Sequence, residues 1–305
     1  MAEHRNRNLA GIMLAAVSSL LVILLGAVGK KLGCELSPFV IVFLYSLFSF
    51  VTFLPAALRG GGFRRVASRV PGMQTIRAAI FAAALIGWFW ALPKVPLADL
   101  TAIGYASSLF TLVGAILFLG EASLLWRWLA LAVGFGGMLV VLKPGFAEIS
   151  GPMLAIVAVS AGMAAARLCN KIVTRIDSPV VLVFWHNGLT TLFSLPTALI
   201  FWQSPSPDQW LWLLLMGLIG TSQQLIGAWA IKFADFGVIE PVNFLKLVWA
   251  AVLGFIFFAE VPPVSTILGG AIIVGAVVYI AQRERREAKV PETLDGPGAG
   301  TPAAP

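Results

Sequence analysis

The sequence has few residues that carry charge or bind metals. Only 11% of its 305 residues are charged, and it contains two histidines and two cysteines. His4 and His186 do not combine with an acid or a serine in a recognisable catalytic pattern. Two cysteines that fall on opposite membrane sides in the topology below form neither a disulfide nor a metal pair. We therefore expect no enzyme, no metal and no cofactor.

Two further classes of protein are disfavoured by what the chain lacks. No segment matches the phosphate-binding loop pattern GxxxxGK[ST], so ATP is not expected to drive the protein. The net charge is +7 and the pI is about 9.8, which on its own would suggest nucleic acid. The basic residues, however, stand singly near the ends of apolar runs and form no patch, so we expect no nucleic-acid partner.

Apolar residues, in contrast, are abundant. They make up 59% of the chain, and the mean hydropathy is +0.92. A soluble domain could not cover so much apolar surface, so the lipid bilayer is the expected solvent. Ten apolar runs are each about long enough to cross the ~30 Å hydrocarbon layer as a helix. They cover residues 9–28, 38–58, 73–92, 98–119, 126–142, 152–170, 179–202, 210–231, 237–258 and 264–281.

The chain contains one unit twice. Residues 37–58 match residues 178–199 without a gap at a shift of 141 positions. Residues 90–121 align with residues 229–260 at a shift of 139, and each block ends in a single glutamate. Each copy therefore holds five apolar runs, and an odd number of crossings makes the second copy insert upside down.

These observations predict an all-α integral membrane protein with ten transmembrane helices in two inverted five-helix repeats. The predicted parts are a first repeat over residues 1–145, a second over 146–282, and a disordered cytoplasmic tail over 283–305.

The basic residues predict the orientation. With the N-terminus in the cytoplasm, 16 of the 21 lysines and arginines fall on the cytoplasmic side, Arg77 among them. Four fall on the far side, and Lys246 lies inside a helix. Because cytoplasmic loops carry the excess of Lys and Arg, we predict a multi-pass protein of a bacterial-type inner (plasma) membrane with both termini cytoplasmic.

Several motifs in the first copy are similar to a known family. They are Phe89-Trp90-Ala91-Leu92, Pro96-Leu97-Ala98-Asp99, Leu119-Gly120-Glu121 and Leu142-Lys143-Pro144-Gly145, and residues 230–260 repeat the pattern more loosely. With the inverted repeat, they make residues 9–282 resemble the drug/metabolite transporter superfamily, EamA type. The resemblance implies a transporter of small metabolites and leaves the substrate open. Similar proteins often carry an arginine where this chain has Tyr45, so an anion-binding role suspected for that arginine would have to be met elsewhere.

Lys246 is the strongest candidate for a substrate contact. It lies about nine residues, or ~14 Å, into its helix, and polar groups at that depth are costly unless they face a cavity. Glu240 and Asn243 precede it at three-residue steps on one side of the helix. Lys246 would contact a negative group of the substrate or a coupling proton, and the alternative is a structural lysine bonded to backbone carbonyls. Glu240 is either a proton-coupling carboxylate or a charge in the cytoplasmic vestibule.

Other side chains are added to the predicted substrate site. His186 is the repeat counterpart of Tyr45, and it either titrates or packs in the core. Gln223 lies midway along its helix and could face the cavity. Trp185 and Trp249 either stack on a planar substrate or pack between helices.

The two glutamates that end the repeated blocks are interpreted differently. Glu121 and Glu260 fall at opposite membrane faces in the predicted topology, so they cannot share one site. We interpret each as a helix-terminal residue that fixes the loop to the next helix.

The sequence therefore predicts a secondary active transporter that moves a small metabolite, amino acid-like or another small organic solute, by alternating access. The alternative is a passive facilitator or channel for a small solute. Coupling to protons or to exchange, and a homodimer, stay open.

Overall fold

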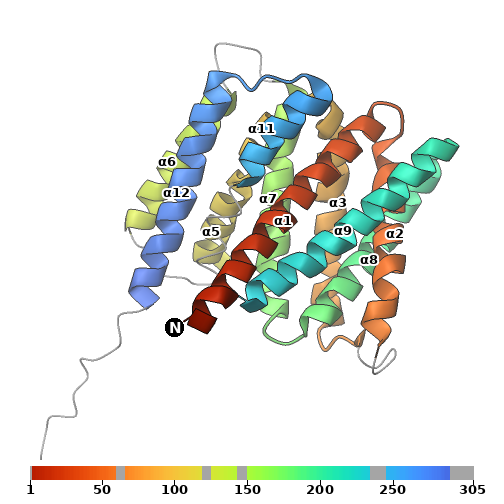
Figure 1. The fold of residues 1–305 in the computed structure, drawn as a ribbon, viewed down its shortest axis with the longest axis horizontal. Helices are drawn as coiled ribbons and strands as arrows, with labels where there is room; N and C mark the ends of the chain where they lie inside the picture. The colour runs from red at the N-terminus through yellow and green to blue at the C-terminus, as the bar shows by residue number, and fades with distance from the viewer. Residues whose placement is uncertain (1, 60–65, 119–124, 143–149, 234–244, 289–305) are drawn as a thin grey trace, which may run out of the picture.

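The computed structural model describes residues 2–59, 66–118, 125–142, 150–233 and 245–288, and within these ranges every regular element is helical (Figure 1). The elements are α1 (Ala2–Gly33), α2 (Pro38–Leu58), α3 (Pro71–Ala91), the short 3-10 helix η2 (Leu92–Lys94), α4 (Leu97–Gly104), α5 (Ala106–Phe118), α6 (Leu125–Leu142), α7 (Gly151–Val173), α8 (Pro179–Ile200), α9 (Pro207–Phe233), α11 (Leu245–Phe258) and α12 (Val264–Ala288).

Proline marks the start of several helices. Pro38, Pro71 and Pro179 each occupy the first position of their helix, where the missing N–H has no intrahelical partner and the fixed φ already suits the helix. Ser178 adds a cap to α8, because its Oγ accepts a hydrogen bond from the Val181 N–H at 3.5 Å. The repeated Ser-Pro pair thus begins the second helix of each predicted repeat.

Several helices are suited to a membrane. Six helical segments in the described part of the chain are long and apolar enough to cross a bilayer, and three more helices are apolar but shorter. The six cover Ala10–Gly33, Pro38–Leu58, Pro71–Lys94, Leu97–Phe118, Gly151–Val173 and Pro207–Gly227. The chain is therefore a multi-pass membrane protein, whereas ten crossings in two repeats stay a prediction.

The helices pack in pairs between elements far apart in sequence. The most extensive pairs are α1 with α9, α6 with α12, α3 with α7, and α2 with α8. In Figure 1, α6 and α12 lie side by side at one edge of the bundle. Gly137 and Gly269 let these two backbones touch, because a Cβ added at either would lie 2.9 or 2.6 Å from the other's carbonyl oxygen.

The run predicted as one helix over residues 98–119 is interrupted. α4 ends at Gly104 and α5 begins at Ala106, with Tyr105 between them. Gly104 fits here because the Trp88 ring lies 3.2 Å from the place of a Cβ. The Ile103 carbonyl accepts a hydrogen bond from Ser160 Oγ of α7 at 3.3 Å, so a neighbouring helix satisfies a carbonyl at the break.

Candidate functional site

A cavity of about 180 Å³ lies between α3, α7 and α8. Its lining combines two cations, two other polar groups and three apolar side chains. These residues are Arg77, Phe81, Met163, Ala166, Arg167, Asn170 and His186. Pockets for whole small molecules are typically ~300–1,000 Å³, so this volume suits one end of a small solute.

Arg77 is the most buried charge in this cavity, with 6% of its surface exposed. It lies six residues after the start of α3, about 9 Å along the helix axis. Its Nη1 donates to Asn170 Oδ1 at 2.7 Å, and its Nη2 donates to the Leu182 carbonyl at 3.0 Å. Its buried Nε finds no acceptor among the described residues.

The other cavity residues add a second cation and a flat apolar wall. Arg167 of α7 donates to Ser108 Oγ, in the first turn of α5, at 3.4 Å. The Phe81 and His186 rings lie 4.3 Å apart between centroids, inclined at 59°. The cavity therefore offers guanidinium groups beside aromatic rings, a combination that suits a solute with an anionic end and an apolar or planar body.

Asp177 holds the start of α3 in place from the α7–α8 connection. Its carboxylate accepts hydrogen bonds from Ser68 Oγ, from the Arg69 N–H at 3.0 Å and from Gln74 Nε2 at 3.0 Å. Burial alone would raise the pKa of Asp177, but these hydrogen bonds outweigh it and lower the pKa below its ordinary value. The anchored first turn then fixes the position of Arg77 one turn further along α3.

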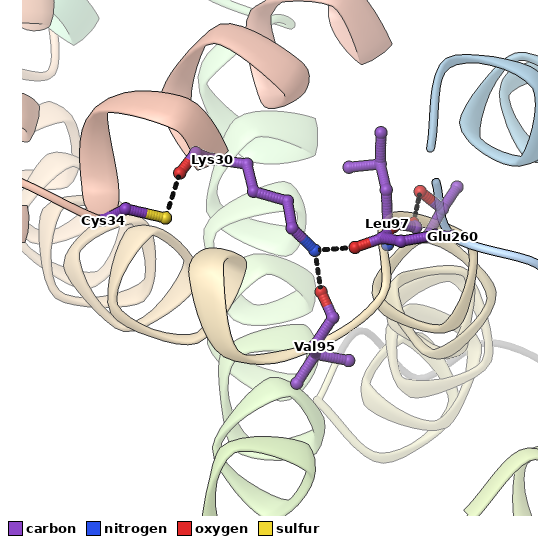
Figure 2. Close-up of polar contacts among 6 residues, drawn as sticks. Lys30, Cys34, Val95, Leu97 and Glu260 are labelled. Atoms are coloured by element: carbon purple, nitrogen blue, oxygen red, sulfur yellow. Dashed lines mark hydrogen bonds and ion pairs between the residues drawn. The ribbon is translucent and has the colours of Figure 1, made fainter. Parts of the chain in front are cut away.

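At the opposite end of α3, a buried ion pair joins α1 to the segment after α11. Figure 2 shows Lys30 Nζ of α1 donating to Glu260 Oε1 and to the Val95 carbonyl, the latter at 2.6 Å. Glu260 Oε2 accepts the Leu97 N–H at 2.8 Å, so the same carboxylate caps the start of α4. The Lys30 ammonium also lies 5.3 Å from the centroid of the Phe258 ring.

This group of residues, which we call the Lys30–Glu260 clamp, joins three helices at one place. Lys30 is 6% exposed and the Glu260 side chain 19% exposed. A buried pair of this kind is costly to break from one side, because the remaining charge loses its partner. Glu260 was predicted to be a helix-terminal residue that fixes the next loop, and in the structure it contacts α1 and α4 as well.

The clamp and the cavity lie near opposite ends of α3. Arg77 is in the second turn of α3, and the clamp includes Val95, just beyond its last residue, Ala91. The distance from Arg77 to the end of the helix is about 21 Å along the axis. One end of the bundle is thus tied together by charge, while the other holds the cavity.

The predicted substrate residues do not all lie in this cavity. His186 lines it, whereas Lys246 is half-buried in the first turn of α11, which packs on α1 and α4. Glu240 and Asn243 lie outside the described residues. The substrate contact predicted for Lys246 stays a proposal, and Lys246 lies apart from the cavity.

The remaining predicted residues join neighbouring helices. Tyr45 packs against Gly220 of α9 and faces the Phe89 ring at 6.1 Å. Gln223 Nε2 donates to Ser18 Oγ of α1 at 3.4 Å. Trp185 Nε1 donates to the Val66 carbonyl at 2.8 Å, and the buried Trp249 Nε1 finds no acceptor among the described residues.

Arg77, Arg167 and Asn170 are cavity residues that the sequence analysis missed. The two arginines were hidden by the rule that assigns basic residues to the cytoplasmic surface. A signal was present, because the proline at 71 already places Arg77 inside a helix rather than in a loop.

The comparison with families of known proteins gives one clear match. The model of the EamA-like transporter family matches residues 9–143 and, a second time, residues 150–282.

Several curated bacterial proteins are similar over most of the chain. The S-adenosylmethionine uptake transporter of Rickettsia felis is 29% identical over 84% of this chain and 87% of its own. The riboflavin transporter of Vibrio cholerae is 32% identical over 72% of this chain and 74% of its own. The pseudopaline exporter CntI of Pseudomonas aeruginosa is 25% identical over 90% of this chain and 97% of its own.

A solved crystal structure has a similar fold. It matches 92% of this chain and 99% of its own with a TM-score of 0.62, at 19% sequence identity. At that identity the similarity concerns the fold alone.

Proposed function

Because the chain belongs to the EamA-like transporter family, we propose that it carries a small organic solute across a bacterial inner membrane by alternating access. The observation that carries the mechanism is the asymmetry along α3, with the Lys30–Glu260 clamp at one end and the cavity at the other. In this arrangement the clamp end is closed and the cavity marks the end from which the solute enters or leaves.

The pattern of helix packing supports two repeats that move against each other. In the predicted repeat register, α1 corresponds to α7, α3 to α9, and α5 to α11. Exchanging the copies turns the α1–α9 pair into the α7–α3 pair, and the α1–α11 pair into the α7–α5 pair. Such exchange symmetry is what inverted repeats supply to a transporter, because the same contacts can close either end in turn.

The interrupted α4–α5 span is consistent with this function. Backbone that departs from a helix at membrane depth is tolerated where it is buried in protein or lines a cavity. Arg167 of the cavity reaches Ser108, one turn past the break. A change in the tilt of α4 against α5 would therefore move Ser108 and, through this hydrogen bond, the Arg167 side chain in the cavity.

The test is transport by the purified protein in liposomes. S-adenosylmethionine, riboflavin and a panel of amino acids, the first two taken from the names of the relatives, would be offered as labelled solutes. Alternating access predicts saturable uptake that is accelerated by the same unlabelled solute inside the vesicles. Empty liposomes give the background. Flux that rises linearly with concentration and is not accelerated from the far side would contradict alternating access and support a facilitator or channel.

A further inference from the structure

Arg77 is a buried cation within a membrane-spanning segment that has no carboxylate partner in the described part of the chain. Lys30 forms an ion pair with Glu260, whereas the Arg77 guanidinium contacts an amide oxygen and a carbonyl. Charged groups at membrane depth are retained where they line a pathway or bind a ligand, because their desolvation is otherwise uncompensated. The charge of Arg77 thus needs an explanation beyond packing.

The carboxylate of Asp177, which contacts the first turn of α3, is already engaged. Its oxygens accept hydrogen bonds from Ser68, Arg69 and Gln74. It therefore reduces the net positive potential near the cavity without occupying the guanidinium. The Nε of Arg77 is buried and has no acceptor among the described residues, and other parts of the side chain line the cavity. A planar guanidinium whose charge has no carboxylate partner suits an oxyanion.

We infer that this cavity binds the anionic group of the transported solute, with Arg77 as the primary contact and Arg167 as the second cation. A small oxyanion such as a carboxylate fits, because the volume of about 180 Å³ holds a small head group beside the Phe81 and His186 rings. The inference rests on the proposed function and narrows its substrate class to solutes that carry a negative group. Lys246 then contacts another part of the pathway.

The inference can be tested without knowing the solute, through the charge preference of thiol labelling in the cavity. Met163 lines the cavity, so Met163→Cys would be made in a chain with Cys34→Ser and Cys169→Ser. The probes are the anionic sulfonatoethyl and the cationic trimethylammonioethyl methanethiosulfonates, each normalised to its rate with a free thiol. One nearby cation in a poorly screened site should make the anionic probe faster by about tenfold.

Variants show whether the preference for the anionic probe comes from Arg77 or from basic residues elsewhere on the surface. Arg77→Gln should lower the preference, and Arg77→Gln with Arg167→Gln should abolish it. Arg77→Lys should keep most of it, and Arg175→Gln, at an exposed arginine of the α7–α8 connection, should leave it unchanged. Equal rates for the two probes before Arg77 is changed, or an undiminished preference in Arg77→Gln, would overturn the inference. Arg77→Gln alters the contacts with Asn170 and Leu182, so its folding is checked by gel filtration and Arg77→Lys is measured beside it.

Competition in lipid nanodiscs identifies the source of the anion. Millimolar glutamate or benzoate should slow labelling of Met163→Cys, whereas choline should not. Slowing only when phosphatidylglycerol replaces phosphatidylcholine would show that a lipid head group occupies the cavity and would overturn the substrate assignment. Labelling needs no transport. A chain that prefers the anionic probe but shows no uptake in liposomes would therefore refute the proposed function without refuting anion binding in the cavity.

Discussion

The Lys30–Glu260 clamp gives the sharpest prediction about what holds the bundle together. Glu260→Gln keeps an acceptor for the Leu97 N–H but leaves Lys30, which is 6% exposed, without its counter-charge. Removing one partner of a buried ion pair costs about 3 kcal/mol or more, which corresponds to a Tm decrease of roughly 6–10 °C for a chain of this size. Lys30→Met should cost less, about 1–2 kcal/mol, because the Glu260 side chain is 19% exposed and still caps α4.

The double variant distinguishes an ion pair from two independent contacts. Lys30→Met with Glu260→Gln leaves no stranded charge and keeps the cap of α4, so its Tm should lie close to that of the wild type. The single effects would then sum to about 4–5 kcal/mol against a double effect near zero, so the coupling energy would be about 4–5 kcal/mol. Lys31→Met is the matched control, since it removes the neighbouring but exposed lysine.

The assay is thermal unfolding in detergent, followed by tryptophan fluorescence at one fixed scan rate, because membrane proteins of this size often unfold irreversibly. Additive single effects, or a Glu260→Gln variant as stable as the wild type, would refute the reasoning. Either result would mean that the pair is solvated and does not join the helices.

Three further predictions follow from other contacts. Asp177→Asn should lower the Tm at neutral pH. Because the pKa of Asp177 is lowered in the folded protein, its contribution to stability is present above the ordinary Asp pKa of about 3.9 and should be lost as the pH falls through the lower folded pKa. A series of Tm measurements against pH would show this loss. Gly137→Ala should destabilise by about 1–3 kcal/mol in thermal unfolding, because the new Cβ would lie 2.9 Å from the Gly269 carbonyl oxygen, while Gly136→Ala, with nothing within 4 Å, should be neutral or slightly stabilising. Lys246→Met should reduce solute counterflow at matched expression more than Lys246→Arg does, and equal rates for both would remove Lys246 from the pathway.

The family and the helical class were predictable from composition and from the repeat. Both properties depend on patterns that a sequence displays directly, namely apolar runs of membrane length and a block that returns after about 140 positions. The EamA-like match across both halves confirms the family. Helix starts were also readable where a proline follows a serine, as at Pro38 and Pro179.

The clamp could not be predicted from the sequence. Lys30 and Glu260 are separated by 230 positions, and no local spacing links a lysine at the end of one helix to a glutamate after another. The break at Tyr105 was hidden for a related reason, because residues 98–119 are mostly apolar and contain no proline. The contact of Trp88 with Gly104 at the break joins different helices.

Arg77 shows how a sound rule can conceal a residue that lines a cavity. Counting lysines and arginines by side of the membrane treats each as a charge in water or at the head groups, which holds for those in loops. Arg77 lies about 9 Å inside α3, with its guanidinium held by Asn170 and by the Leu182 carbonyl. Lys246 was noticed because it is far from both ends of the helix predicted over residues 237–258, whereas Arg77 is close enough to one end of its helix to look interfacial. Depth along a helix therefore does not by itself separate a surface charge from a ligand-binding one, since the neighbouring helices decide whether the side chain reaches water or a cavity.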